Sequence, residues 1–253
     1  MTSSTIGSLD WARKTRGLLT RRERAQLAAQ AIAAQVRIAP ARMRYRIGLG
    51  AELAGAVPKD FEGPDSAICQ QAEELLQDVR RPEIVGHSYR TYCWARILAR
   101  RDRVNHDSEI LYVAALLHDF GLSAANGGQP RCFTLVGAEK AIELAREASW
   151  SAQAQLAVAE AITLHMNIKV EALEGPEAHL LTAGAQLDVT GARYWELSAA
   201  AREAVLSRHP RISSKKALAR LFRDEARNNP KTRAAVYDRL TGGRHPLRAP
   251  FDH

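Results

Sequence analysis

Residues 108–122 read SEILYVAALLHDFGL, an apolar run that ends in a histidine followed by an aspartate. The run predicts a helix. One face of this helix carries Leu111, Ala114, Ala115 and His118, which follow i, i+3, i+4 and i+7 spacing. His118 is therefore expected in a core. Asp119 points about 100° further round the helix, but Gly121 ends the helix two residues later, and a terminal turn can bring neighbouring side chains together. Since the C-terminus of a helix also attracts a cation, the stretch predicts a buried helix that ends in a metal site.

The rest of the chain is predicted to be helical as well. Alternation of β-branched and aromatic residues is rare, and alanine, leucine, arginine and glutamate dominate the long segments. Thr20 and Glu23 have the spacing of a capping box, which begins a helix that Pro40 is expected to end. We expect an all-α protein with helices at 21–38, 66–78, 83–101, 108–119, 134–149, 151–166, 177–190, 199–208, 213–227 and 231–239.

The domain organisation follows from length and composition. A chain of 253 residues with 46% hydrophobic content suits one large domain or two small ones, and we favour one. Four glycines and two prolines in residues 47–67 predict a connector. We expect a single helical domain over residues 1–253, made of N-terminal helices and connector (1–80), a metal-binding core (83–193) and additional C-terminal helices (194–253).

The charge is unevenly distributed along the chain. Lys and Arg outnumber acids by 10 to 2 in residues 1–50 and by 13 to 5 in residues 201–253, whereas residues 51–200 hold 13 against 21. The segments thus carry +8, +8 and −8, respectively. Basic ends are typical of nucleic-acid or membrane surfaces, and also of basic helices that pack beside an acidic body. Because no aromatic residue interleaves with the charges of residues 21–38, we do not expect a nucleic-acid partner.

The cellular compartment is predicted from cysteine use and from segments that the chain lacks. Cys69, Cys93 and Cys132 are scattered and odd in number, which suits a reducing compartment better than a disulfide framework. The first residues hold no apolar signal-peptide region, and no run is long enough to span a membrane. We therefore expect a cytoplasmic protein without a membrane partner, and the formation of a homo-oligomer stays open.

Further ionisable residues lie on predicted helix faces. His87 shares one face with Arg90, Thr91 and Trp94, whereas His165 ends an apolar stripe. Asp188 follows Leu181 and Gly184 at helical spacing, so its carboxylate is predicted to be buried and to need a partner. By contrast, the pair His106-Asp107 precedes an apolar run, where Asp107 or Ser108 is expected to cap a helix.

Each of these residues also has an ordinary structural interpretation. His87 would be a core histidine, Asp188 a carboxylate that pairs two helices, and His165 a hydrogen-bonded filler. Arg90 would form a salt bridge. The alternative is that a divalent cation joins Asp188 to His87, His118 and Asp119, and the order of the motifs along the chain favours it.

This order resembles that of the HD-domain superfamily of metal-dependent hydrolases, which are all-helical bundles. The resemblance implies that one metal ion is bound by His87, His118, Asp119 and Asp188. The chain is similar to the cyanamide-hydratase-like subgroup over about residues 83–233, in the motifs HSYRTYCWA, LLHDFGL, CFTLVGAEKA, AITLH, AQLDVTG and HPRISSKKALARLF. In that subgroup an acidic residue often follows the phenylalanine that matches Phe133, whereas this chain has Thr134. The resemblance thus implies a small-molecule substrate with cyanamide as one candidate.

The ligand set limits the metal and the chemistry. Two imidazoles and two carboxylates suit one divalent ion, zinc as our first expectation and iron, manganese or nickel as alternatives. A metal-bound hydroxide would attack a small electrophile, with Asp119 and His165 as catalytic residues. Candidate substrate-binding residues are Arg90, Trp94, Thr134 and His165. His165 could instead help to hold a second metal, with His179.

Four functions remain open from the sequence. The first is a metal-dependent hydratase or hydrolase acting on a cyanamide- or nitrile-type compound. The second is a phosphohydrolase acting on a nucleotide or phosphate monoester, which a basic surface would favour. The third is a mixed-valent oxygenase with two irons. The fourth is a non-catalytic, nucleic-acid-binding or partner-binding helical protein, but a purely structural metal site would not need an open coordination position.

Overall fold

The structure is a computed structural model that describes residues 5–49, 53–123, 130–211, 214–243 and 250–251. Every regular element in these ranges is a helix, and the only β-type pairing among them is an isolated bridge between Ala54 and Leu197. The expected all-α class is therefore confirmed. The α-helices are α1 (Leu9–Thr15), α2 (Arg21–Arg46), α3 (Ala67–Asp78), α4 (Pro82–Asp102), α5 (Ser108–Leu117), α6 (Phe133–Glu147), α7 (Ala152–Leu164), α8 (Pro176–Thr190), α9 (Ala199–Arg208), α10 (Ser214–Asn228) and α11 (Arg233–Thr241). Short 3₁₀ helices are η1 (Pro58–Phe61), η2 (Phe120–Leu122) and η3 (Tyr194–Glu196).

Helix α5 lies at the centre of the bundle. It contacts α3, α4, α6, α7 and α8, and every residue from Ile110 to Leu117 is buried. An apolar helix that is covered on all sides needs no polar face, which explains why its sequence is a nearly unbroken apolar run. Asp107 begins it as the N-cap, accepting hydrogen bonds from the backbone N–H groups of Glu109 and Ile110 at 2.9 and 3.1 Å. The cap interpretation of His106-Asp107 is thus confirmed.

Helices α4 and α8 approach each other closely beside α5. A Cβ atom on Gly184 would lie 2.4 Å from the backbone oxygen of Thr91, so only glycine allows this distance. The contact fixes how the C-terminal half of α8 is positioned along the first half of α4. Asp188, one turn after Gly184, is thereby placed beside residues of α4.

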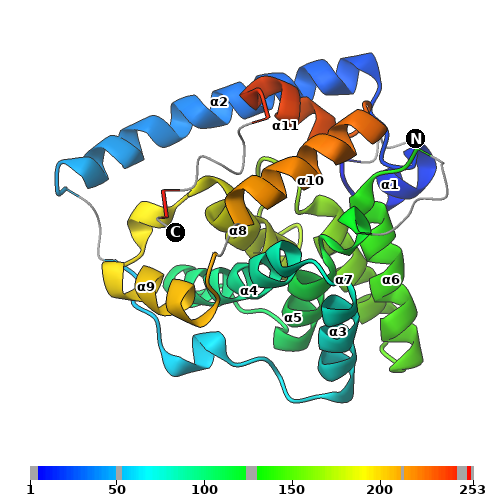
Figure 1. Cartoon of the computed structure of the whole chain (residues 1–253), viewed down its shortest axis with the longest axis horizontal. Helices are drawn as coiled ribbons and strands as arrows, with labels where there is room; N and C mark the ends of the chain where they lie inside the picture. The colour runs from blue at the N-terminus through cyan, green and yellow to red at the C-terminus, as the bar shows by residue number, and fades with distance from the viewer. Residues whose placement is uncertain (1–4, 50–52, 124–129, 212–213, 244–249, 252–253) are drawn as a thin grey trace.

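Helix α2 lies across the outside of the bundle, alongside α11 (Figure 1). The predicted capping box is present, because the backbone N–H of Glu23 donates to the hydroxyl of Thr20 and the backbone N–H of Thr20 donates to the carboxylate of Glu23. The expected end at Pro40 is wrong, since α2 continues through Pro40 to Arg46. A proline removes the hydrogen bond to the carbonyl four residues earlier, here that of Val36. Val36 is 69% exposed, so water can replace the lost bond and the helix continues.

The terminal segments pack on the central helices. Helix α1, which the sequence did not predict, contacts α6 and α7 and buries Leu9 and Trp11. One hydrophobic core contains these two residues together with Val236 and Tyr237 of α11. Phe251 stacks on Trp94 of α4, with ring centroids 5.6 Å apart. The division at residues 80, 83 and 194 stays a prediction.

Two further features concern the cysteines and the length of the helices. All three cysteines are buried and unpaired, and burial raises the pKa of Cys69 to about 11 and that of Cys93 to about 12. Within the described ranges, no helix combines the length and the apolar character that crossing a membrane requires.

Candidate metal centre

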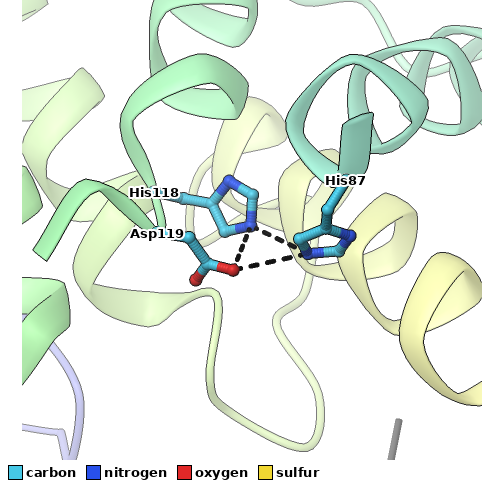
Figure 2. A group of neighbouring side chains, drawn as sticks. All are labelled: His87, His118 and Asp119. Atoms are coloured by element: carbon cyan, nitrogen blue, oxygen red, sulfur yellow. Dashed lines mark hydrogen bonds and ion pairs between the residues drawn. The ribbon is translucent and has the colours of Figure 1, made fainter. Parts of the chain in front are cut away.

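Three buried side chains converge where α5 ends beside α4: His87, His118 and Asp119 (Figure 2). The Nε2 atoms of the two histidines lie 3.2 Å apart. The Oδ2 atom of Asp119 is 3.6 Å from His87 Nε2 and 3.5 Å from His118 Nε2. Among the described residues, these three form the group whose ligand atoms lie close enough together to hold one metal ion.

The end of α5 makes this convergence. His118 is the C-cap, and the backbone of Asp119 turns to φ −104° and ψ 6° as the chain enters η2. Gly121 lets η2 pack against α6, because a Cβ atom there would lie 2.2 Å from the backbone oxygen of Phe133. Consecutive side chains that would diverge on a regular helix therefore point to one place, as the sequence predicted.

Hydrogen bonds fix which ring nitrogens face the centre. The Nδ1–H of His118 donates to the carbonyl of Ala115 at 2.8 Å, and the Nδ1–H of His87 donates to Oδ2 of Asp188 at 2.8 Å. A neutral imidazole has one N–H, so each Nε2 carries a lone pair. Burial lowers the pKa of His118, which keeps that ring neutral. With both rings neutral, as metal ligands are, two lone pairs face each other at 3.2 Å.

Asp119 supplies the negative charge of the centre. Both of its carboxylate oxygens are buried and have no hydrogen-bond partner among the described atoms. A buried carboxylate without a partner is strongly unfavourable, and so are two lone pairs in contact. A divalent cation bound by two imidazole nitrogens and a carboxylate oxygen resolves both, so the residues present fit a metal ion.

His165 lies on the other side of Asp119, at the end of α7. Its Nε2 atom is 3.7 Å from Oδ1 of Asp119, while its Nδ1–H donates to the carbonyl of Ile162 at 2.7 Å. Burial and the neighbouring His118 lower its pKa well below the ordinary value of 6.5. A third lone pair therefore faces the same carboxylate, from a ring outside the group of three.

Asp188 is bound on the opposite side of His87. Besides the bond from His87, its carboxylate accepts hydrogen bonds from Arg90 at 2.8 and 3.1 Å, from Trp94 at 3.1 Å and from Arg211 at 2.8 Å. Burial raises the pKa of Asp188, but the guanidinium of Arg90, the bond to His87 and Arg211 outweigh it and hold that pKa well below 3.8. Asp188 is thus an ionised carboxylate that contacts Nδ1 of His87 and lies outside the group of three ligand residues.

The proposed substrate-binding residues lie in different places. Arg90 and Trp94 are buried against Asp188 and are not among the residues that line the cavity beside the metal centre. Thr134 is buried at the start of α6, where its hydroxyl accepts a hydrogen bond from Arg233 at 3.1 Å. Of the four candidates, His165 is the one that lines the cavity beside the metal centre. His179 is not in the group, and its Nδ1–H donates to the carbonyl of Val170 at 2.7 Å.

A cavity of about 250 Å³ opens from the centre, and His87, Asp119 and His165 line its inner end. The remaining wall comes from α2, α8, α10, α11 and the segment after α7, and most of it is apolar. Sequence reasoning missed this wall and the role of Arg211. Arg211 follows a proline in a segment without helical periodicity, so no local pattern shows that it faces Asp188.

The HD domain family model matches residues 84–214, about half of the chain, from the third residue of α4 to the start of α10. The matched region contains the three residues of the centre together with Asp188 and His165. A search of curated proteins found no match.

Proposed function

This chain belongs to the HD domain family, and from that premise we propose that it is a metal-dependent hydratase or hydrolase that acts with water on a small nitrogen compound of the cyanamide or nitrile type. HD domains are typically metal-dependent hydrolases, and the buried cluster is compatible with a divalent metal ion. The observation that carries the proposal is the convergence of two imidazole lone pairs and an unpartnered carboxylate at the inner end of a cavity.

The residues divide into ligands and a positioning residue. His87, His118 and Asp119 would hold the ion, zinc first and iron, manganese or nickel as alternatives. Asp188 would act on Nδ1 of His87, where a carboxylate fixes the tautomer and the orientation of the ring. This assignment replaces the expected set of four ligands with three, which leaves more coordination positions for water and substrate.

Water activation would be shared between the ion and two side chains. When bound, a divalent ion lowers the pKa of a water molecule and polarises the electrophile. His165 would accept a proton at Nε2, since its Nδ1–H is already donated to Ile162 and its lowered pKa keeps the ring neutral. Once that nitrogen is protonated, Oδ1 of Asp119, 3.7 Å away, would stabilise the positive charge of the ring.

The test uses the two histidine–aspartate pairs of the chain. Purified protein and the His118→Ala variant are compared for metal content by elemental analysis, with His106→Ala as the matched control because His106 lies outside the cluster. We expect about one equivalent of metal in the protein and in the control, and a loss of it in His118→Ala.

Activity is measured on the same samples as urea from cyanamide, amide from small nitriles and phosphate from nucleotides. Urea or amide formation that disappears in His118→Ala and persists in His106→Ala supports the hydratase. Phosphate release alone would replace it with a phosphohydrolase, and two equivalents of iron would point to an oxygenase. Absence of metal and of turnover, together with salt-sensitive retention on DNA or RNA, would favour the non-catalytic alternative.

A further inference from the structure

The walls of the cavity carry little positive charge. None of the described residues that line it is a lysine or an arginine. Two aspartates, Asp119 and Asp238, do line it. The buried guanidinium groups of this region are engaged elsewhere: those of Arg90 and Arg211 are bound to Asp188, and that of Arg233 donates to Asn167, Thr134 and Thr163. A divalent ion bound at the centre would attract a phosphate group, but no cationic side chain of the described wall would add to that attraction, and the carboxylate of Asp238 would oppose it, so the wall favours a neutral body over an anionic one.

The size of the cavity exceeds that of the smallest candidate. Its volume of about 250 Å³ equals the liquid volume of roughly eight water molecules at ~30 Å³ each. Cyanamide has three non-hydrogen atoms and would leave most of this space unfilled. Because the outer part is lined by alanine, isoleucine, valine, leucine and phenylalanine side chains, the space suits an apolar group better than ordered water.

Helix α2 supplies one side of this apolar space. Leu27, Ala31, Ala34 and Ile38 follow one helical face, and the last three line the cavity. Helix α2 precedes the region that the family model matches, residues 84–214, and α11 follows it. The part of the cavity wall that α2 and α11 supply therefore lies outside the matched HD domain.

We propose that the substrate is a neutral molecule with two parts: an electrophilic carbon–nitrogen head at the metal centre, and an apolar body, the size of a phenyl or butyl group, against α2. The inference rests on the proposed function for its head group only. The small side chains of Ala31 and Ala34 set the length of the body, since a larger side chain at either position would occupy the space that it fills.

The first measurement is binding to metal-free protein by titration calorimetry, with benzonitrile, 4-nitrophenyl phosphate and AMP as probes. We expect benzonitrile to bind and the two phosphates to bind at least 10-fold more weakly. Ala31→Leu is expected to weaken benzonitrile binding at least 10-fold. Ala33→Leu is the matched control, because Ala33 lies on the same helix but is exposed and does not line the cavity.

A second variant covers the case in which Ala31→Leu does not fold. Ile38→Ala removes volume from the same wall and is expected to increase the preference for a longer nitrile, such as heptanenitrile, over butyronitrile. Tighter binding of either phosphate than of benzonitrile would overturn the proposal, and so would equal benzonitrile binding by Ala31→Leu and Ala33→Leu. Binding that Ala31→Leu abolishes, without amide formation by the metal-loaded protein, would uphold the neutral apolar ligand and overturn the proposed hydration of nitriles.

Discussion

Replacement of Asp188 by asparagine tests whether Asp188 orients His87 or binds the metal directly. Asparagine retains an oxygen that can accept the Nδ1–H of His87, now 2.8 Å away, but it carries no charge. Loss of a group that orients a ligand typically weakens metal binding by about 10- to 100-fold. At about 1.4 kcal/mol per factor of ten, we expect a loss of about 1.4–2.8 kcal/mol in zinc binding, with the stoichiometry unchanged.

The same change is expected to destabilise the metal-free fold. The Asp188 carboxylate faces the buried guanidinium groups of Arg90 and Arg211, and removal of one partner of a buried ion pair costs about 3–5 kcal/mol. Asp60→Asn is the matched control, because Asp60 is also buried and pairs with Arg100 at 2.8 Å, outside the metal cluster. That control is expected to lose stability but to keep its zinc affinity.

The assay is competition for Zn²⁺ with a chromophoric chelator, together with urea unfolding of the metal-free proteins. Asp119→Asn gives the reference for a lost ligand, since Oδ2 of Asp119 lies within 3.6 Å of both histidine Nε2 atoms and neither carboxylate oxygen has a hydrogen-bond partner among the described residues. If folded Asp188→Asn bound as little zinc as Asp119→Asn, Asp188 would be a direct ligand and the proposed three-ligand site would be wrong. Unchanged affinity in Asp188→Asn would equally refute the orienting role.

Two further predictions concern the fold. Gly184→Ala places a Cβ atom 2.4 Å from the backbone oxygen of Thr91, so we expect its free energy of unfolding, measured in urea, to fall by roughly 1–3 kcal/mol. The control Gly55→Ala, whose Cβ atom would meet no atom within 4 Å, should change this free energy little. Equal effects of the two variants would contradict the close contact. Metal-free protein should lose stability as the pH falls below 6.5 toward 4. The unfolded chain takes up protons at the ordinary histidine pKa, whereas the folded state holds the pKa lower at His118, at His165 and, at about 4, at His209. A stability that stays constant from pH 7 to 4.5 would show that these histidines are protonated in the fold.

The central helix and the clustering of His118 and Asp119 at its end could be predicted from sequence because their signals are local. An apolar run of helical period that ends in a histidine and a glycine fixes both the burial of His118 and the turn that brings Asp119 beside it. The caps at Thr20 and Asp107 were predicted for the same reason, since each depends on residues within three positions.

What the sequence could not show comes from interactions that span the chain or depend on solvent. Spacing placed Asp188 near His87, but it does not say which ring nitrogen the carboxylate meets, so the choice between a ligand and an orienting group at Asp188 stays a prediction. Arg211 reaches Asp188 across 23 residues, from a segment without periodicity. Helix α2 passes Pro40 because the affected turn is exposed, and exposure is a property of the fold.

The burial of all three cysteines makes the chain a convenient background for site-specific labelling. A thiol reacts as the thiolate, and raised pKa values keep Cys69 and Cys93 protonated at neutral pH, while Cys132 is shielded from solvent. A cysteine introduced at the exposed position of Ala33 would therefore react with a maleimide dye far faster than the native thiols. Such a dye would report on α2 in otherwise unaltered protein.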